Sequence, residues 1–201
     1  MTDSPNETAV RIALTRHGET EWNLVGRLQG SSDIPLNDTG RTQAVESAAR
    51  FTAADWDAVA TSPLSRAAET GSIIAAELGL PVVGTYDDLR ERHYGAGEGL
   101  TMEDVNRLWP GRDYTDLEDR EVVAARGLAA LETIAREHPG FSVIVVAHGT
   151  LIREVLRTLT VTVVPSIENA ATSIVERVDG TWRVLTINGA EHSDAVAPAR
   201  L

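Results

Sequence analysis

The sequence predicts an α/β fold, a three-layer α/β/α sandwich whose sheet is mainly parallel and has one antiparallel edge. Short apolar runs alternate with segments of helical periodicity, the order that a parallel sheet requires because helices make its crossovers. Near the end of the chain, two strand-like segments flank an Asp-Gly turn signal, which indicates an antiparallel pair. The 201 residues contain no repeat and no linker, so we expect a single domain over 1–201, with loose termini at 1–9 and 189–201.

Three apolar runs predict the parallel strands, at about 10–15, 58–60 and 143–146. The third run is apolar throughout, which is typical of a central strand buried on both faces. Residues 81–83 are expected to begin no more than an extended connection. The antiparallel pair is expected at about 172–178 and 182–187.

Helical spacing of apolar residues, capping residues and terminal glycines predict the helices, at about 40–53, 64–79, 101–109, 119–137 and 150–159. Residues 18–39 are rich in Gly, Asn, Asp, Ser and Pro and therefore form a long loop. A loop of that length inside a compact domain is usually functional. The stretch Gly95–Gly99 is too rich in glycine for regular structure.

Composition limits the function classes. The absence of cysteine excludes disulfides and thiolate metal sites. The polar start carries no secretory signal and no apolar segment reaches the roughly 20 residues that span a bilayer, so a cytoplasmic protein is expected. The net charge of −12 argues against a nucleic acid or an anionic membrane as partner. All 18 cationic residues are arginines, so a site for an anion must concentrate arginines locally.

Three of the predicted strands end in residues suited to an anion. Arg16-His17-Gly18 follows the first, Ser62 to Arg66 the second, and His148-Gly149 the third. In open α/β sheets, ligands bind at this edge, where helix N-termini also present free N–H groups. Arginine binds phosphate or carboxylate oxygens bidentately, and a neutral histidine is nucleophilic near pH 7. Each ending alone could be an ordinary turn, but three together favour one anion pocket.

With these residues the chain resembles the histidine phosphatase (phosphoglycerate mutase-like) superfamily. The resemblance is carried by blocks spanning about 10–153, which are Arg16-His17-Gly18-Glu19-Thr20-Glu21-Trp22-Asn23, Arg27-Leu28-Gln29-Gly30, Asp33-Ile34-Pro35-Leu36-Asn37, Thr61-Ser62-Pro63-Leu64-Ser65-Arg66-Ala67, Leu89-Arg90-Glu91 and Ala147-His148-Gly149. Their order and spacing make the match highly specific. Asn169-Ala170 resembles a weaker C-terminal landmark of the family.

The resemblance implies a role for each site residue. His17 is expected to be the nucleophile that forms a phosphohistidine, and Glu91 the general acid and then the base. Residues expected to hold the phosphoryl oxygens are Arg16, Asn23, Arg66, His148 and Gly149. No metal and no other cofactor is expected, because arginines and a histidine supply the positive field. Glu98, which lies nearby, is the alternative candidate for the general acid. Arg153 is expected to form a structural ion pair.

Three functions remain open. The preferred one is a phosphatase for a small phosphorylated substrate. The alternative is a cofactor-dependent phosphoglycerate mutase, since Glu91-Arg92-His93-Tyr94-Gly95 is similar to the mutase stretch; however, residues 100–118 lack the basic insert of mutases. The third is an inactive module that binds a phosphorylated ligand. A homodimer is a family-level expectation only.

Overall fold

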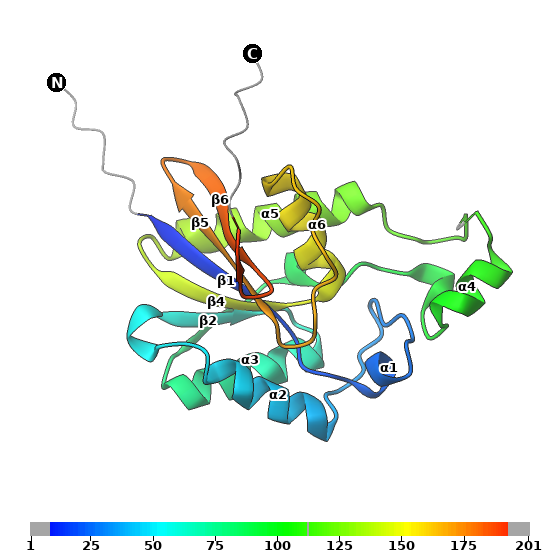
Figure 1. Ribbon diagram of the computed structural model, residues 1–201, viewed down its shortest axis with the longest axis horizontal. Coiled ribbons are helices and arrows are strands. Elements are labelled where there is room, and N and C mark those ends of the chain that lie inside the picture. The colour runs from blue at the N-terminus through cyan, green and yellow to red at the C-terminus, as the bar shows by residue number, and fades with distance from the viewer. Residues whose placement is uncertain (1–8, 112, 193–201) are drawn as a thin grey trace, which may run out of the picture.

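The computed structural model describes residues 9–111 and 113–192. Its centre is a seven-stranded sheet with the strand order β3-β2-β4-β1-β5-β6-β7 (Figure 1). The strands β3 (Val82–Thr85), β2 (Ala58–Thr61), β4 (Ser142–Ala147) and β1 (Val10–Arg16) run parallel. The strands β5 (Thr172–Val178), β6 (Thr181–Ile187) and β7 (Ala190–Glu191) continue the sheet antiparallel. The predicted fold class is therefore confirmed.

Helices cover the two faces of the sheet (Figure 1). The helices α2 (Asp38–Ala48) and α3 (Ser65–Leu78) cover one face, and α5 (Arg120–Glu137) and α6 (Gly149–Leu159) cover the other. Side chains alternate along a strand, so Ile12 and Leu14 pack toward α5 and α6 while Ala13 packs toward α2 and α3. Both faces of the parallel strands are therefore core, which explains their continuous apolar runs.

The predicted strands and helices lie close to their observed bounds, except at the end of α2. This helix was expected to reach residue 53 but ends at Ala48. The amides of Arg50 and Phe51 bond the carbonyls three residues back, which tightens the chain into a turn. The turn brings the Phe51 ring to 5.3 Å from the Trp56 ring, and the short 3₁₀ helix η1 (Ala53–Asp55) follows.

The other differences between the predicted and the observed structure are short elements. The connection after residue 81 is β3, an edge strand whose partly exposed residues give no continuous apolar run. Residues 190–191 form β7 on β6, so the expectation of a loose end is wrong at these two residues. The expectations for 1–8 and 193–201 lie outside the described residues. Gly95–Gly97 forms a 3₁₀ turn, η3, and another, η2, spans Asp87–Leu89.

Two small helices stand beyond the carboxyl ends of the parallel strands, α1 (Glu21–Leu24) in the long loop and α4 (Met102–Leu108) (Figure 1). Thr20 caps α1, since its hydroxyl accepts from the Asn23 amide and the Asn23 side chain accepts from the Thr20 amide. The isolated bridge between Arg27 and Thr101 joins the long loop to the start of α4. Within the described residues, no helix is long and apolar enough to span a membrane.

Candidate active site

Parallel pairing brings the three predicted strand ends together. Arg16 at the end of β1 is level with Ala147 on β4, and Thr61 at the end of β2 is level with Val146 on the other side of β4. The residues that follow each strand therefore lie at one edge of the sheet, the edge at which α3 and α6 begin. This is the arrangement expected from the sequence.

His17 is buried, with 3% of its surface exposed. Its Nδ1 lies 2.7 Å from the carbonyl oxygen of Gly18. A carbonyl only accepts, so Nδ1 carries the proton and a neutral ring has its lone pair on Nε2. Burial, and then the positive charges of Arg16 and Arg66, lower the pKa of His17 well below its usual value. The ring is therefore neutral at pH 7 and its Nε2 is available as a nucleophile.

His148 is the N-cap residue of α6 and is fully buried beside His17, with the two ring centroids 5.2 Å apart. Its Nε2 lies 2.8 Å from the Ser62 hydroxyl. Its Nδ1 has no hydrogen-bond partner among the described residues. Burial and the charge of Arg66 lower the pKa of this ring as well. His148 does not line the cavity; its ring packs against His17, which does, and its Nδ1 is a buried polar atom without a partner among the described residues.

Arg66 is completely buried, which rules out the surface ion pair that its position in the first turn of α3 could have meant. Its two terminal nitrogens donate to the carbonyls of Ser32 and Gly30, at 2.8 and 2.9 Å. Arg16 donates to the carbonyl of Ile167 at 2.8 Å. The Nε atoms of Arg16 and Arg66 are buried without a partner among the described residues. Burial lowers the pKa of both groups, yet a guanidinium stays charged in a protein.

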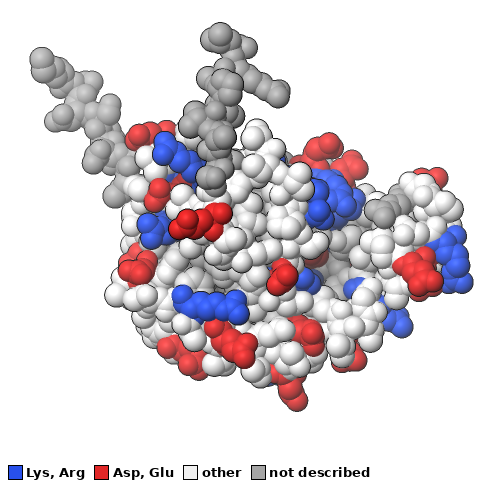
Figure 2. Space-filling model, in the orientation of Figure 1, with Lys and Arg blue, Asp and Glu red and all other residues white. Residues whose placement is uncertain are grey.

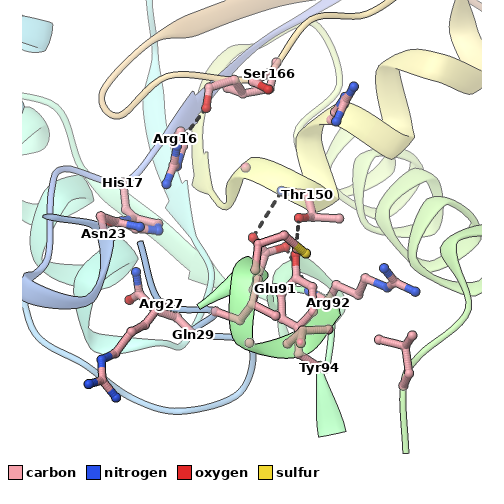
Figure 3. Close-up of a pocket in the computed structure, with 18 of the residues that line it drawn as sticks. Arg16, His17, Asn23, Arg27, Gln29, Glu91, Arg92, Tyr94, Thr150 and Ser166 are labelled. Carbon is pink, nitrogen blue, oxygen red and sulfur yellow. Dashed lines mark hydrogen bonds between the residues drawn. The ribbon is translucent and has the colours of Figure 1, made fainter. Parts of the chain in front are cut away.

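Asn23 lies beside His17 at the cavity wall (Figure 3). Its Oδ1 accepts hydrogen bonds from the amide and hydroxyl of Thr20 and from Nδ2 of Asn169. These three bonds occupy the carbonyl side of the amide, so its NH₂ group remains as a donor for the cavity. Gly149 brings the start of α6 against Arg16, because a Cβ at this position would lie 3.2 Å from the Arg16 Nε.

Glu91, and not Glu98, lies at the cavity. Its carboxylate accepts from the amides of Thr150 and Leu151 at 3.1 Å each, the first two free N–H groups after Gly149 in α6 (Figure 3). Glu98 instead accepts from the amides of Ser31 and Ser32 and from the Ser32 hydroxyl. Burial raises the pKa of Glu98, but these hydrogen bonds outweigh it and the pKa is lowered. Glu98 therefore holds the long loop in place.

The cavity at this edge has a volume of about 340 Å³. In the space-filling view the surface is hollowed between the α4 segment and the body of the molecule (Figure 2). Among the described residues, Glu91 is the one carboxylate in its wall, which also holds six arginines, at positions 16, 27, 66, 92, 120 and 153. The rest of the wall is largely apolar or aromatic, from Leu28, Tyr94, Met102, Val105, Tyr114, Leu117 and Ile167. A chain of net charge −12 thus places six of its 18 arginines around one cavity, the local concentration that was expected.

This geometry matches a known family. The family model described as histidine phosphatase superfamily (branch 1) matches residues 12–190. The chain belongs to the histidine phosphatase superfamily. The uncharacterized phosphatase PhoE of Bacillus subtilis is 37% identical over 90% of this chain and 95% of its own length. The metal-independent phosphoserine phosphatase of Arabidopsis thaliana is 34% identical over 92% of this chain and 84% of its own length.

Solved structures agree. A mycobacterial glucosyl-3-phosphoglycerate phosphatase, complexed with VO3, superimposes with a TM-score of 0.79 and 30% sequence identity, over 90% of this chain and 99% of that one. Phosphoglycerate mutases also occur among the relatives. Family membership and the phosphatase relatives identify this histidine phosphatase superfamily member as a phosphoric monoester hydrolase.

The sequence pointed to Asn169, Tyr94 and Arg153 in this superfamily member but did not predict their contacts at the site. Asn169 donates from Nδ2 to the carbonyl of His17 at 3.1 Å as well as to Asn23, so it holds both. The Tyr94 hydroxyl lies 2.6 Å from the Thr150 hydroxyl, above Glu91 (Figure 3). Arg153 was expected in an ion pair, but among the described residues it has no carboxylate partner within bonding distance and instead lines the cavity. No local pattern marks any of these contacts, since each joins segments distant in sequence.

No three His, Asp or Glu side chains in residues 9–111 and 113–192 are grouped so that they could hold a metal ion.

Proposed function

We propose that the protein hydrolyses a small phosphorylated metabolite through a phosphohistidine at His17, without a metal ion. The observation that carries the proposal is the protonation pattern of His17. Because Nδ1 donates to Gly18, the Nε2 lone pair is left in a cavity flanked by two guanidinium groups. A nucleophile beside fixed positive charge suits phosphoryl transfer, whose transition state spreads negative charge over the phosphoryl oxygens.

The reaction has two balanced steps. In the first, His17 Nε2 forms a bond to phosphorus, the ester P–O bond breaks, and the protonated Glu91 donates its proton to the leaving oxygen. In the second, water attacks the phosphohistidine, the P–N bond breaks, and Glu91 takes up the proton from the water. Arg16, Arg66, His148 and the Asn23 amide hold the phosphoryl oxygens throughout. Inorganic phosphate leaves and the enzyme returns to its first state.

The segment between η3 and α5 favours hydrolysis over the mutase alternative. It contributes Met102, Val105, Tyr114 and Leu117 to the cavity wall, all apolar or aromatic. Arg107 on α4 bonds Asp104 at 2.6 Å and does not line the cavity. Arg112 lies outside the described residues. Because the described residues of this segment bring no basic group to the cavity wall that could hold a phosphorylated intermediate in place, transfer to water is favoured.

A phosphate-release screen over phosphorylated metabolites, run in excess chelator, tests the proposal. We expect turnover of at least one small phosphomonoester at an unchanged rate with chelator, in keeping with the metal-independent relative. Efficient conversion of 3-phosphoglycerate to its isomer with a bisphosphate primer, without net phosphate release, would favour the mutase. Loss of activity on chelation, restored by a divalent metal, would contradict the metal-free mechanism.

A further inference from the structure

The cavity holds more positive charge than a phosphoryl group needs. A phosphate monoester carries about two negative charges at pH 7, which Arg16 and Arg66 beside His17 match. Four more arginines line the same wall, at positions 27, 92, 120 and 153. These four arginines are positive charge beyond what the phosphoryl group needs, and of them Arg120 is paired with the Glu154 carboxylate.

Arg153 is the arginine of this group best placed to bind a ligand. Arg27 donates a terminal nitrogen to the Gly99 carbonyl, and Arg92 is fixed by the Glu118 carbonyl and stacked over the Tyr94 ring. Arg153 is held only through Nε, which donates to the Val164 carbonyl at 3.2 Å. Its two terminal nitrogens have no hydrogen-bond partner among the described residues, although its side chain lines the cavity.

The charge around Arg153 is unbalanced. The buried carboxylate of Glu154 bonds both Arg120 and Arg157. Two guanidinium groups thus share one carboxylate, and the neighbouring Arg153 is not bonded to it. Burial lowers the pKa of Arg153, and the charges of Arg157 and Arg120 lower it further against the opposing effect of Glu154. An anion bound here would offset this repulsion.

Helix geometry fixes where such an anion would lie. Gly149 abuts Arg16, and Arg153 follows it by four residues in α6. Residues four apart lie on the same face of a helix, about 6 Å apart along its axis. Arg153 is therefore one helical turn from the phosphoryl-binding arginine. This spacing suits a second charged group a few bonds away from the phosphate ester in one small molecule.

We propose that Arg153, with Arg120 beside it, is a specificity-determining residue that binds a second anionic group on the leaving part of the substrate. The substrate class is then a small phosphomonoester that also carries a carboxylate or a second phosphate. This inference rests on the proposed function. It assigns the second subsite to α6 and the start of α5, and not to residues 100–118.

Three esters that differ only in this group provide the test. In 3-phosphoglycerate a carboxylate stands where glycerol 3-phosphate has an uncharged hydroxymethyl group, and glycerol 1,3-bisphosphate carries a second phosphate instead. We expect kcat/KM of the unaltered enzyme to be at least about 10-fold higher for one of the two doubly charged esters than for glycerol 3-phosphate. The better of the two identifies the second group as carboxylate or phosphate.

Three variants locate the subsite. Arg153→Gln should lower kcat/KM for the preferred ester by about 10- to 100-fold, mainly through KM, as for loss of a hydrogen bond between charged groups. It should leave glycerol 3-phosphate within about twofold. Arg153→Lys should keep part of the preference. Arg157→Gln is the matched control, because Arg157 lies on the same helix and bonds Glu154 but does not line the cavity.

Equal loss for charged and uncharged esters in Arg153→Gln, or no preference in the unaltered enzyme, would overturn the inference while phosphatase activity stands. Hydrolysis of none of these esters and none of the wider screen would instead overturn the proposed function, and the inference with it.

Discussion

Gly18 sets the tautomer of His17, and this one contact leaves the Nε2 lone pair available for the nucleophilic role proposed for the ring. The carbonyl of Gly18 accepts the Nδ1 proton, and the buried arginines keep the ring from gaining a second one. The same arginines would hold the oxygens that His17 attacks. Sequence alone predicts the residue types, but not the tautomer, because the acceptor is a backbone atom.

Glu91 lies at the cavity, whereas Glu98 holds the long loop in place. Sequence spacing alone could not tell which of the two carboxylates lies at the cavity. Glu91→Gln removes the group proposed as proton donor, so alkyl phosphates should be hydrolysed about 10²- to 10⁴-fold more slowly. p-Nitrophenyl phosphate should lose far less, because its leaving group needs no proton. Steady-state kinetics with both esters measure the difference. Glu98→Gln is the matched control: it weakens the loop and should affect both esters alike. If Glu91→Gln slowed both esters equally, Glu91 would not be the acid.

At the scale of single elements, the first turn of α2 packs directly against the backbone of Glu19, in the long loop that follows His17. A Cβ on the buried Gly40 would lie 2.1 Å from the Glu19 carbonyl oxygen and 2.7 Å from its amide nitrogen. These are backbone atoms two residues from His17, so a shift of the Glu19 backbone would also displace His17. Helix α2 therefore requires glycine at a position where other residues normally favour a helix more.

Gly40→Ala tests this contact, because its expected effect has the opposite sign to helix propensity. Alanine in a helix normally stabilises by about 1 kcal/mol relative to glycine. Here we expect destabilisation of about 1–3 kcal/mol from overpacking, together with a fall in kcat. Chemical denaturation and phosphatase assays measure both. Gly111→Ala is the control, since its Cβ would meet nothing closer than 3.5 Å. A stabilised, fully active Gly40→Ala protein would disprove the close packing.

Most of the fold follows from the sequence, because burial and periodicity are local signals. The apolar runs predicted β1, β2 and β4, and the apolar stripes predicted α3 and α5. The edge strands β3 and β7 were missed, since exposure removes the apolar pattern from one and the other has two residues. The residues that follow β1, β2 and β4 were predicted to meet at one edge of the sheet, and the structure brings them together there. The support by Asn169 and the wall made by Arg120 and Arg153 were not predicted, because tertiary packing alone brings them there.

At the scale of the whole molecule, the site makes stability depend on pH. His17 and His148 are buried and neutral, with pKa values well below the value of about 6.5 expected in the unfolded chain. Below that pH the unfolded state binds more protons than the folded state. The two neutral histidines should therefore make their full contribution to the free energy of unfolding above pH 6.5. Below that pH this free energy should fall on acidification, by up to about 1.4 kcal/mol per pH unit for each histidine.

Denaturant unfolding between pH 7 and 5.5 measures this slope. His148→Gln should reduce it by about the share of one histidine, whatever the variant does to stability at pH 7. An unchanged slope in His148→Gln would mean that His148 is protonated in the folded protein.

The measurement that most directly tests the whole account is rapid acid-free quenching of the enzyme during turnover of a ³²P-labelled substrate, followed by peptide mapping. The account predicts one phosphoryl group on His17, labile to acid and stable to base, which forms and decays fast enough to carry steady-state turnover. His17→Asn should abolish both label and turnover. Turnover at the normal rate without label at His17, or in the His17→Asn protein, would contradict it.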